Sequence, residues 1–228
     1  MKHNHVPDTS RAKVAILADL KPVKPLLPAW IFLAGFAIIF TLLCGFSVYR
    51  LPPWGWQALS TVQKLSIFGT LAVSASLLGH SLVREMAPGS KKWLPPAWGP
   101  VLAFGLLIPV MIMSLPFESD EDFLSNGLVC LRLGFGWVVL AGALFWLLLR
   151  RGAWLSPLAE GTATGTLAGL VGVTVLQLHC PILDRAHVVT WHLGAAALGA
   201  GAGFLLALMG RNFSRTRAKE SMEACQPT

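Results

Sequence analysis

The run WIFLAGFAIIFTLLCGFSV, residues 30–48, decides the fold class of this chain. It places 19 residues in a row without a single charged side chain. About 18 or more such residues are enough to carry a helix across the ~30 Å hydrocarbon core of a bilayer. The apolar core of a cleavable signal peptide is shorter, roughly 7–15 residues. The 29 residues before this run are polar, basic and rich in proline. We therefore predict a membrane-spanning helix rather than a signal peptide.

The rest of the chain repeats this pattern. Hydrophobic residues make up 54% of the 228 positions and charged residues only 13%, whereas soluble domains carry roughly 25% charged residues. We predict an all-α integral membrane bundle of six transmembrane helices. The predicted spans are Trp30–Val48, Leu65–Val83, Trp98–Leu115, Cys130–Leu149, Pro157–Leu178 and Val188–Gly210. The second span is the weakest, because several serines and His80 dilute it.

The basic residues predict the orientation of this bundle. If six spans are assumed, fourteen of the 18 lysines and arginines fall on the side of the two termini. The opposite side keeps four, together with the acidic run Glu118–Asp122. Because lysine and arginine are retained on the cytoplasmic side, both termini are predicted to be cytoplasmic. Basic residues distributed in this way indicate a topology signal and not a nucleic-acid-binding surface.

Three regions follow from this topology. Residues 1–29 form a cytoplasmic N-terminal tail, residues 30–210 the six-helix transmembrane domain, and residues 211–228 a basic cytoplasmic C-terminal tail. Within the first tail, Val14, Leu17 and Ala18 share one face of a short amphipathic helix that Pro22 would end. This helix could rest on anionic lipid headgroups, or it could place its apolar face in the groove of a soluble partner.

Small residues recur every four positions on the last two predicted spans. Gly161, Gly165 and Gly169 form one stripe, and Ala195, Gly199 and Gly203 form the other. Such stripes let two helix backbones approach closely within a membrane. We predict a tight hairpin of these two spans, with homo-oligomerisation as the alternative use of the stripes.

The turn of that hairpin, LQLHCPILDRAHVVTWH (residues 176–192), concentrates the reactive side chains on the outer face. Cys130, at the start of the fourth span, is predicted to lie at the same depth as Cys180. Two cysteines at one depth on an oxidising face are candidates for a disulfide bond. One alternative is a metal or haem site that uses His179, Cys180, His187 and His192. The other is a set of interfacial histidines that cap helices or sense pH. The sequence assigns no particular metal.

No motif in the sequence indicates an enzyme or a cofactor. The sequence has no phosphate-binding glycine loop and no HExxH motif. Ionisable residues are also missing from the centres of the predicted spans, which argues against an ion or proton transporter. Two other classes stay open beside regulation. One is a small membrane redox or transport protein that uses the outer histidines and cysteines, and the other is a scaffold subunit.

Three further segments are distinctive when taken together: ILADLKPVKPLLPAW (16–30), NGLVCLRL (126–133) and LHCPILDRAHVVTWHLG (178–194). Together they resemble the NrsF family of six-span anti-sigma factors of the bacterial inner membrane. The resemblance implies that the chain holds an extracytoplasmic-function sigma factor inactive and releases it on a thiol, metal or oxidant stress. It implies no direct contact with nucleic acid.

The resemblance also implies roles for particular residues. The sigma factor would bind the cytoplasmic tail at Asp19, Leu20, Lys21, Pro22, Val23, Lys24 and Pro25. Cys130 and Cys180 would sense the signal on the outer face. His179, Asp184, His187 and His192 would assist them.

Overall fold

The computed structural model describes residues 28–86, 94–117, 122–150 and 156–224. These residues form helices joined by short connections, and no strand occurs among them. The predicted tail segment Asp19–Pro25 lies outside the described residues, as does most of the acidic run Glu118–Asp122.

A helix stands at each of the six predicted positions. Five of them are long and apolar enough to cross a membrane: α2 (Ala29–Arg50), α4 (Thr61–Met86), α6 (Phe123–Leu149), α7 (Pro157–His179) and the helical run Arg185–Asn212. The sixth, α5 (Trp98–Ser114), is apolar but has 17 residues. The weakest predicted span is therefore helical over its whole length, and α5 is the short one.

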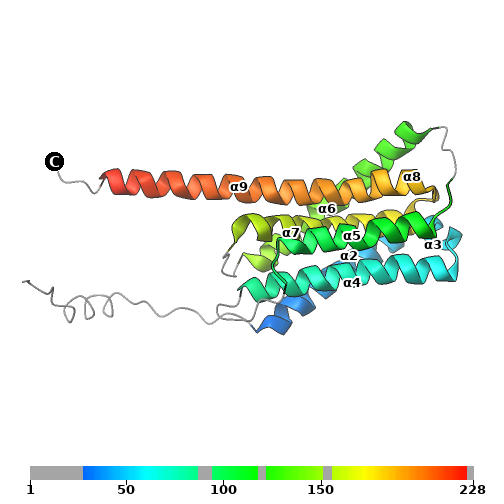
Figure 1. Cartoon of the computed structure of the whole chain (residues 1–228), viewed down its shortest axis with the longest axis horizontal. Coiled ribbons are helices and arrows are strands. Elements are labelled where there is room, and N and C mark those ends of the chain that lie inside the picture. Colours follow the sequence, from blue (N-terminus) through cyan, green and yellow to red (C-terminus); the bar gives the residue numbers. More distant parts are fainter. Residues whose placement is uncertain (1–27, 87–93, 118–121, 151–155, 225–228) are drawn as a thin grey trace, which may run out of the picture.

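The α5 helix lies antiparallel to α4 over nearly all of its length. Near the start of α4, the Gln63 side chain donates a hydrogen bond of 2.7 Å to the carbonyl of Ser114, the last residue of α5. Near the end of α4, the Ser81 hydroxyl donates a 2.9 Å bond to the carbonyl of Leu94, just before α5. Figure 1 shows the two helices side by side. Although α5 is shorter, it therefore covers most of the depth that α4 covers.

The last helical run has three parts. A short turn α8 (Arg185–His187) leads into a π-helical segment η1 (Val188–His192), which continues as α9 (Leu193–Ala224). The α9 helix continues past Gly210, where the sequence predicts the membrane domain to end, and extends beyond the other helices (Figure 1). The first residues of α2 lie toward that same end of the bundle, which we call the terminal end. The opposite end, at α3 (Trp54–Ala58) and α8, is called the α8 end.

The α7 helix occupies the centre of the bundle, and most of its side chains are buried. It touches α9 through the predicted small-residue stripes. The space that a side chain at Gly165 would need is filled by the backbone of Gly199, and that at Gly203 by the backbone of Gly161. Toward the α8 end, Gly169 of α7 contacts Ala196 of α9. Ala195, which the sequence predicted in this stripe, faces Gly134 of α6 instead. The predicted hairpin of these two helices is confirmed.

This seam predicts the effect of a paired set of substitutions. A Cβ at Gly199 would lie 2.6 Å from the carbonyl oxygen of Gly165, whereas a Cβ at Gly201, two residues along α9, would meet nothing within 4 Å. Because α7 would have to move away, we expect Gly199→Ala to destabilise the protein by about 1–3 kcal/mol. We expect Gly201→Ala to be neutral or slightly stabilising. Unfolding in mixed detergent micelles measures both, and equal stability of the two variants would contradict the seam.

Candidate metal centre

Two cysteines and two histidines meet at the α8 end. Cys130 comes from the second turn of α6, Cys180 directly follows α7, and His187 and His192 end α8 and η1. Their four donor atoms all lie within 4.8 Å of one another. We call these four residues the Cys₂His₂ cluster. Cys180 and both histidines are buried, and Cys130 is half-buried, so Cys130 is the most exposed member of the cluster.

The π-helical segment is the local feature that brings the two histidines together. In an α-helix, residues five positions apart lie ~140° apart around the axis. The backbone N–H of Leu193 donates to the carbonyl of Val188, five residues earlier, as well as to that of Thr190. This wider turn places more residues in one revolution, so His187 and His192 come near one face. Their ring centroids are 5.5 Å apart.

The turn before these histidines is fixed from two sides. The Asp184 carboxylate caps α8 by accepting a 2.9 Å hydrogen bond from the backbone N–H of His187. The backbone N–H of Arg185 donates to the carbonyl of Pro116, and its guanidinium donates to that of Leu115. The turn is thereby attached to the segment that follows α5. Asp184 positions the backbone of His187 and is not a member of the cluster.

One face of α6 closes the cluster from the other side. Phe123, Gly127 and Cys130 follow one another at helical spacing, and each meets the segment 180–192. The Phe123 ring packs edge-on against His187, with centroids 6.4 Å apart. At Gly127 the Trp191 indole occupies the space that a side chain would need. The glycine therefore lets α6 approach closely enough for Cys130 to reach Cys180.

The structure does not support the candidate disulfide. The Sγ atoms of Cys130 and Cys180 are 3.4 Å apart, and no disulfide bond joins them. A disulfide bond requires sulfur atoms about 2.05 Å apart. The Cys130 thiol points at Cys180 as a hydrogen-bond donor, and it lowers the pKa of Cys180. Burial opposes this shift, whereas the contact of the Cys180 sulfur with His187 adds to it. The thiolate of Cys180, the form that binds metals, is thus favoured.

The structure also corrects the set of residues in the alternative metal site. His179 does not join the cluster, because its Nδ1 lies 3.0 Å from the carbonyl oxygen of Pro52 and its Nε2 lies 3.0 Å from the Ser47 hydroxyl. It fastens the end of α7 to the end of α2. Cys130, which the metal alternative left out, takes its place. Successive side chains point in directions ~100° apart around a helix axis, so the adjacent positions 179 and 180 at the end of α7 contact different neighbours.

The donor set suits a thiophilic cation. Zinc bound tetrahedrally at ~2.3 Å from sulfur and ~2.0–2.1 Å from nitrogen holds its donor atoms roughly 3.3–3.8 Å apart. The two sulfurs are 3.4 Å apart, and Cys180 Sγ is 3.7 Å from His187 Nε2. His192 Nε2 is buried and has no hydrogen-bond partner in the described structure. Thiolates with imidazoles select Zn²⁺ or Cu⁺ over hard cations.

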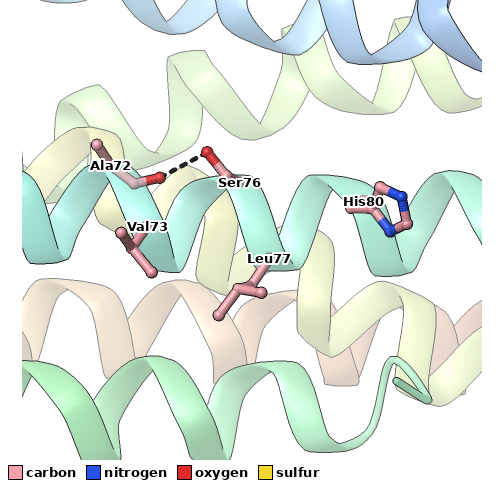
Figure 2. A pocket seen from close by; sticks show the side chains of 5 residues that line it. All are labelled: Ala72, Val73, Ser76, Leu77 and His80. Carbon is pink, nitrogen blue, oxygen red and sulfur yellow. Dashed lines mark hydrogen bonds between the residues drawn. The ribbon is translucent and has the colours of Figure 1, made fainter. Parts of the chain in front are cut away.

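A hollow elsewhere in the bundle offers no comparable chemistry. Figure 2 shows it along α4, lined by Ala72, Val73, Ser76, Leu77 and His80. Its volume is about 410 Å³. The Ser76 hydroxyl is turned to the carbonyl of Ala72 on the same helix, at 2.7 Å. The walls are therefore largely apolar, as expected for a helix face in contact with lipid.

Comparison with known proteins identifies the family. A family model described as a negative regulator of sigma F, NrsF, matches residues 16–211. The chain belongs to the NrsF family. A protein of Azospira oryzae with the name "Probable anti-sigma-F factor NrsF" is 31% identical over 145 residues. The match covers 61% of this chain and 66% of the relative, so the chain spans just under two thirds of the length of that relative. No solved structure matches the chain.

Family membership confirms the resemblance found in the sequence. The matched region includes all four members of the Cys₂His₂ cluster and also residues 19–25. The sequence had pointed to Cys180, His187 and His192 as one alternative and to Cys130 with Cys180 as another. Sequence analysis identified neither Gly127 nor Gln177, a buried residue that contacts His192. The spacing of Phe123, Gly127 and Cys130 along one helix face was the available signal for the glycine.

The geometry predicts which residues bind a cation. In purified, reduced protein we expect Co²⁺ to produce the absorption bands of a tetrahedral thiolate site. Cys130→Ser, Cys180→Ser, His187→Ala and His192→Ala should each weaken binding at least tenfold, because each removes one donor atom.

His179→Ala is the control for this titration. It removes a histidine adjacent to the cluster that contacts Ser47 and Pro52 instead. It should leave Co²⁺ affinity within about threefold while lowering stability. Loss of binding in His179→Ala together with retention in His192→Ala would refute the assignment of ligands.

Proposed function

We propose that this protein is an anti-sigma factor of the bacterial inner membrane that crosses the bilayer six times. Its cytoplasmic side would hold an extracytoplasmic-function sigma factor, and the Cys₂His₂ cluster would receive the signal outside. The observation that carries this proposal is the cluster itself, because it stands at one end of a bundle whose described chain ends lie at the other (Figure 1). Membership in a family of negative regulators of a sigma factor supports the partner.

The contacts of α5 support its role as the sixth span. Hydrogen bonds join the start of α4 to the end of α5 and the end of α4 to the segment just before α5. The α5 residues Ala103, Leu107 and Met111 are buried. Because α5 runs antiparallel to α4, it returns the chain to the α8 end, where α6 begins. Six crossings place both termini on one side, and the excess of lysine and arginine on that side supports a cytoplasmic location.

The segment proposed to bind the sigma factor directly precedes α2. Asp19–Pro25 is separated from Ala29 by only three residues, so a partner held there lies against the terminal end of the bundle. The α9 helix extends from the same end. A short apolar and basic segment of this kind can bind in a groove of a soluble partner. The two tails and the ends of the helices together would form the docking face.

The arrangement of the donors suggests how the signal travels. Cys180, His187 and His192 belong to the α7–α9 hairpin, whereas Cys130 belongs to α6. A cation held by all four fixes the distance between α6 and the hairpin. Because the glycine seam joins α7 and α9 along their length, we infer that a displacement at the α8 end moves both helices at the terminal end. That movement would weaken the docking face.

The magnitudes favour a cation over a disulfide as the signal. To change a partner from ~99% bound to ~99% released, the two states must differ in affinity for the signal by about 5.5 kcal/mol. A disulfide contributes typically ~2–4 kcal/mol. Binding of Zn²⁺ at structural sites is worth roughly 10–16 kcal/mol. A disulfide would also make no use of the two imidazoles.

A small redox or transport protein is the competing proposal from another class. It would use the same cluster to pass electrons or cations across the bilayer. The two proposals differ in what they require of the tail, because Asp19–Pro25 has no role in transfer across the membrane.

A transcription assay tests the regulatory proposal. The chain is produced together with the sigma factor encoded beside it, and transcription is measured from the promoter of that factor. We expect the wild-type chain to repress, and deletion of residues 1–25 to restore transcription although the protein still reaches the membrane. Wild-type protein that leaves transcription unchanged would refute the anti-sigma role.

The same assay separates a cation signal from an oxidant signal. We expect Cys130→Ser and Cys180→Ser to abolish induction by Zn²⁺ or Cu⁺ and by a thiol oxidant. His192→Leu should abolish induction by cations only, because two thiols can form a disulfide without an imidazole. Induction by cations that persists in His192→Leu would contradict the proposed site, and His179→Gln serves as the control.

A further inference from the structure

Gln177 is a buried amide at the boundary between the cluster and the bundle core. It lies on the last turn of α7, three residues before Cys180, and its side chain is fully buried. Its Oε1 is 3.0 Å from Nδ1 of His192, and its Nε2 is 3.5 Å from Sδ of Met111 on α5. An amide in an apolar interior costs free energy unless it is hydrogen-bonded. Both of its polar atoms are turned to these two partners.

The hydrogen-bonding chemistry of Met111, Gln177 and His192 determines which of their atoms donate and which accept. A thioether sulfur has no hydrogen to donate, so Met111 can only accept a hydrogen bond. The amide nitrogen must therefore face Met111, and the amide oxygen must face His192. A carbonyl oxygen only accepts, so His192 must carry its proton on Nδ1.

A proton on Nδ1 of His192 determines the state of Nε2, the other nitrogen of the ring. In a neutral imidazole with a proton on Nδ1, Nε2 carries a lone pair. His192 Nε2 is buried without a hydrogen-bond partner in the described part of the chain. The side chain offers its second nitrogen to the cluster, where all donor atoms lie within 4.8 Å of one another. A lone pair is what a metal ligand requires, and an N–H would repel a cation.

We propose that Gln177, oriented by Met111, is a positioning residue that holds His192 in the tautomer whose Nε2 binds a thiophilic cation. This inference rests on the proposed use of the cluster as a cation site. Gln177 does not touch the cation and acts through the ring that it orients. Metal-bound histidines commonly donate their second N–H to an oxygen in this way, and loss of the oxygen typically weakens metal binding 10–100-fold.

The backbone around Gln177 keeps the path in place. Gly55 of α3 packs directly against the carbonyl oxygens of Gln177 and Cys180, where a Cβ would lie only 2.5 and 2.6 Å away. The α3 helix therefore packs tightly against the end of α7, next to Gln177. This contact fixes the backbone of Gln177 relative to that of Cys180, so the amide that orients His192 and the Cys180 thiol are positioned together.

Three substitutions distinguish the positioning of His192 by Gln177 from a contribution of Gln177 to core packing alone. Gln177→Leu removes the acceptor and frees the His192 proton to occupy either nitrogen. Gln177→Glu keeps an oxygen that accepts from Nδ1–H, so it should preserve the tautomer. Met111→Leu removes the sulfur that orients the amide, so it should give an intermediate effect. Thr174→Val is the matched control, because the buried Thr174 hydroxyl of α7 donates its hydrogen bond to the Leu170 carbonyl of the same helix.

The first measurement needs no metal. Nitrogen NMR of reduced, metal-free protein with ¹⁵N-labelled histidine reports which ring nitrogen carries the proton, and loss of a signal in His192→Gln assigns the ring. We expect wild type, Thr174→Val and Gln177→Glu to show His192 protonated on Nδ1, and Gln177→Leu to show a mixture. His192 protonated on Nε2 in the wild type overturns the proposal.

The second measurement is a titration of the same proteins with Co²⁺. We expect affinity to fall 10–100-fold in Gln177→Leu, less in Met111→Leu, and to stay within about threefold in Gln177→Glu and Thr174→Val. Equal affinity in Gln177→Leu and wild type overturns the proposal. If the wild type binds no cation but keeps the Nδ1–H tautomer, the proposed cation signal fails while the control of the tautomer by Gln177 holds.

Discussion

The close approach of the α7 and α9 backbones is the constraint on which the rest of the structure depends. Glycines face glycines across this seam, and the backbone atoms of Gly165 and Gly199 occupy the space that side chains would take. Within a membrane, contact of this kind replaces the hydrophobic driving force that folds soluble helices. The seam also determines where the turn between the helices lies. With the two helices in contact, the turn has to place Cys180 close to His187 and His192.

The fold class and the seam between α7 and α9 could both be predicted from the sequence, because both follow from local patterns. Long apolar runs predict helices, and a four-residue repeat of glycine predicts contact. The sequence paired Cys130 with Cys180, and grouped Cys180 with His187 and His192, only as separate alternatives. The four residues could not be predicted as one cluster, for two physical reasons. Cys130 is separated from Cys180 by 50 positions, and only the packing of α6 brings them together. His187 and His192 share a face through a π-helical turn, and an α-helical projection places them well apart.

His179 illustrates the opposite error. Its position next to Cys180 in the sequence made it a natural ligand, but the helix directs it to Ser47 and Pro52 on the other side of α7. Gln177 could not be recognised at all. Its role depends on a sulfur from α5 and a nitrogen from η1, and neither is near it in the sequence.

In the function that we propose, the division of donors between α6 and the hairpin determines which signals the cluster can transmit. Three donors belong to the α7–α9 hairpin and its turn, which the glycine seam joins. The fourth, Cys130, belongs to α6, which approaches the cluster where Gly127 lies against the Trp191 indole. A ligand that binds all four donors must therefore act on the position of α6 relative to the hairpin. Any signal that leaves this position unchanged, however tightly it binds, can shift no equilibrium at the other end of the bundle. We therefore expect the contact between α6 and the hairpin to be the element that differs between the proposed holding and releasing states.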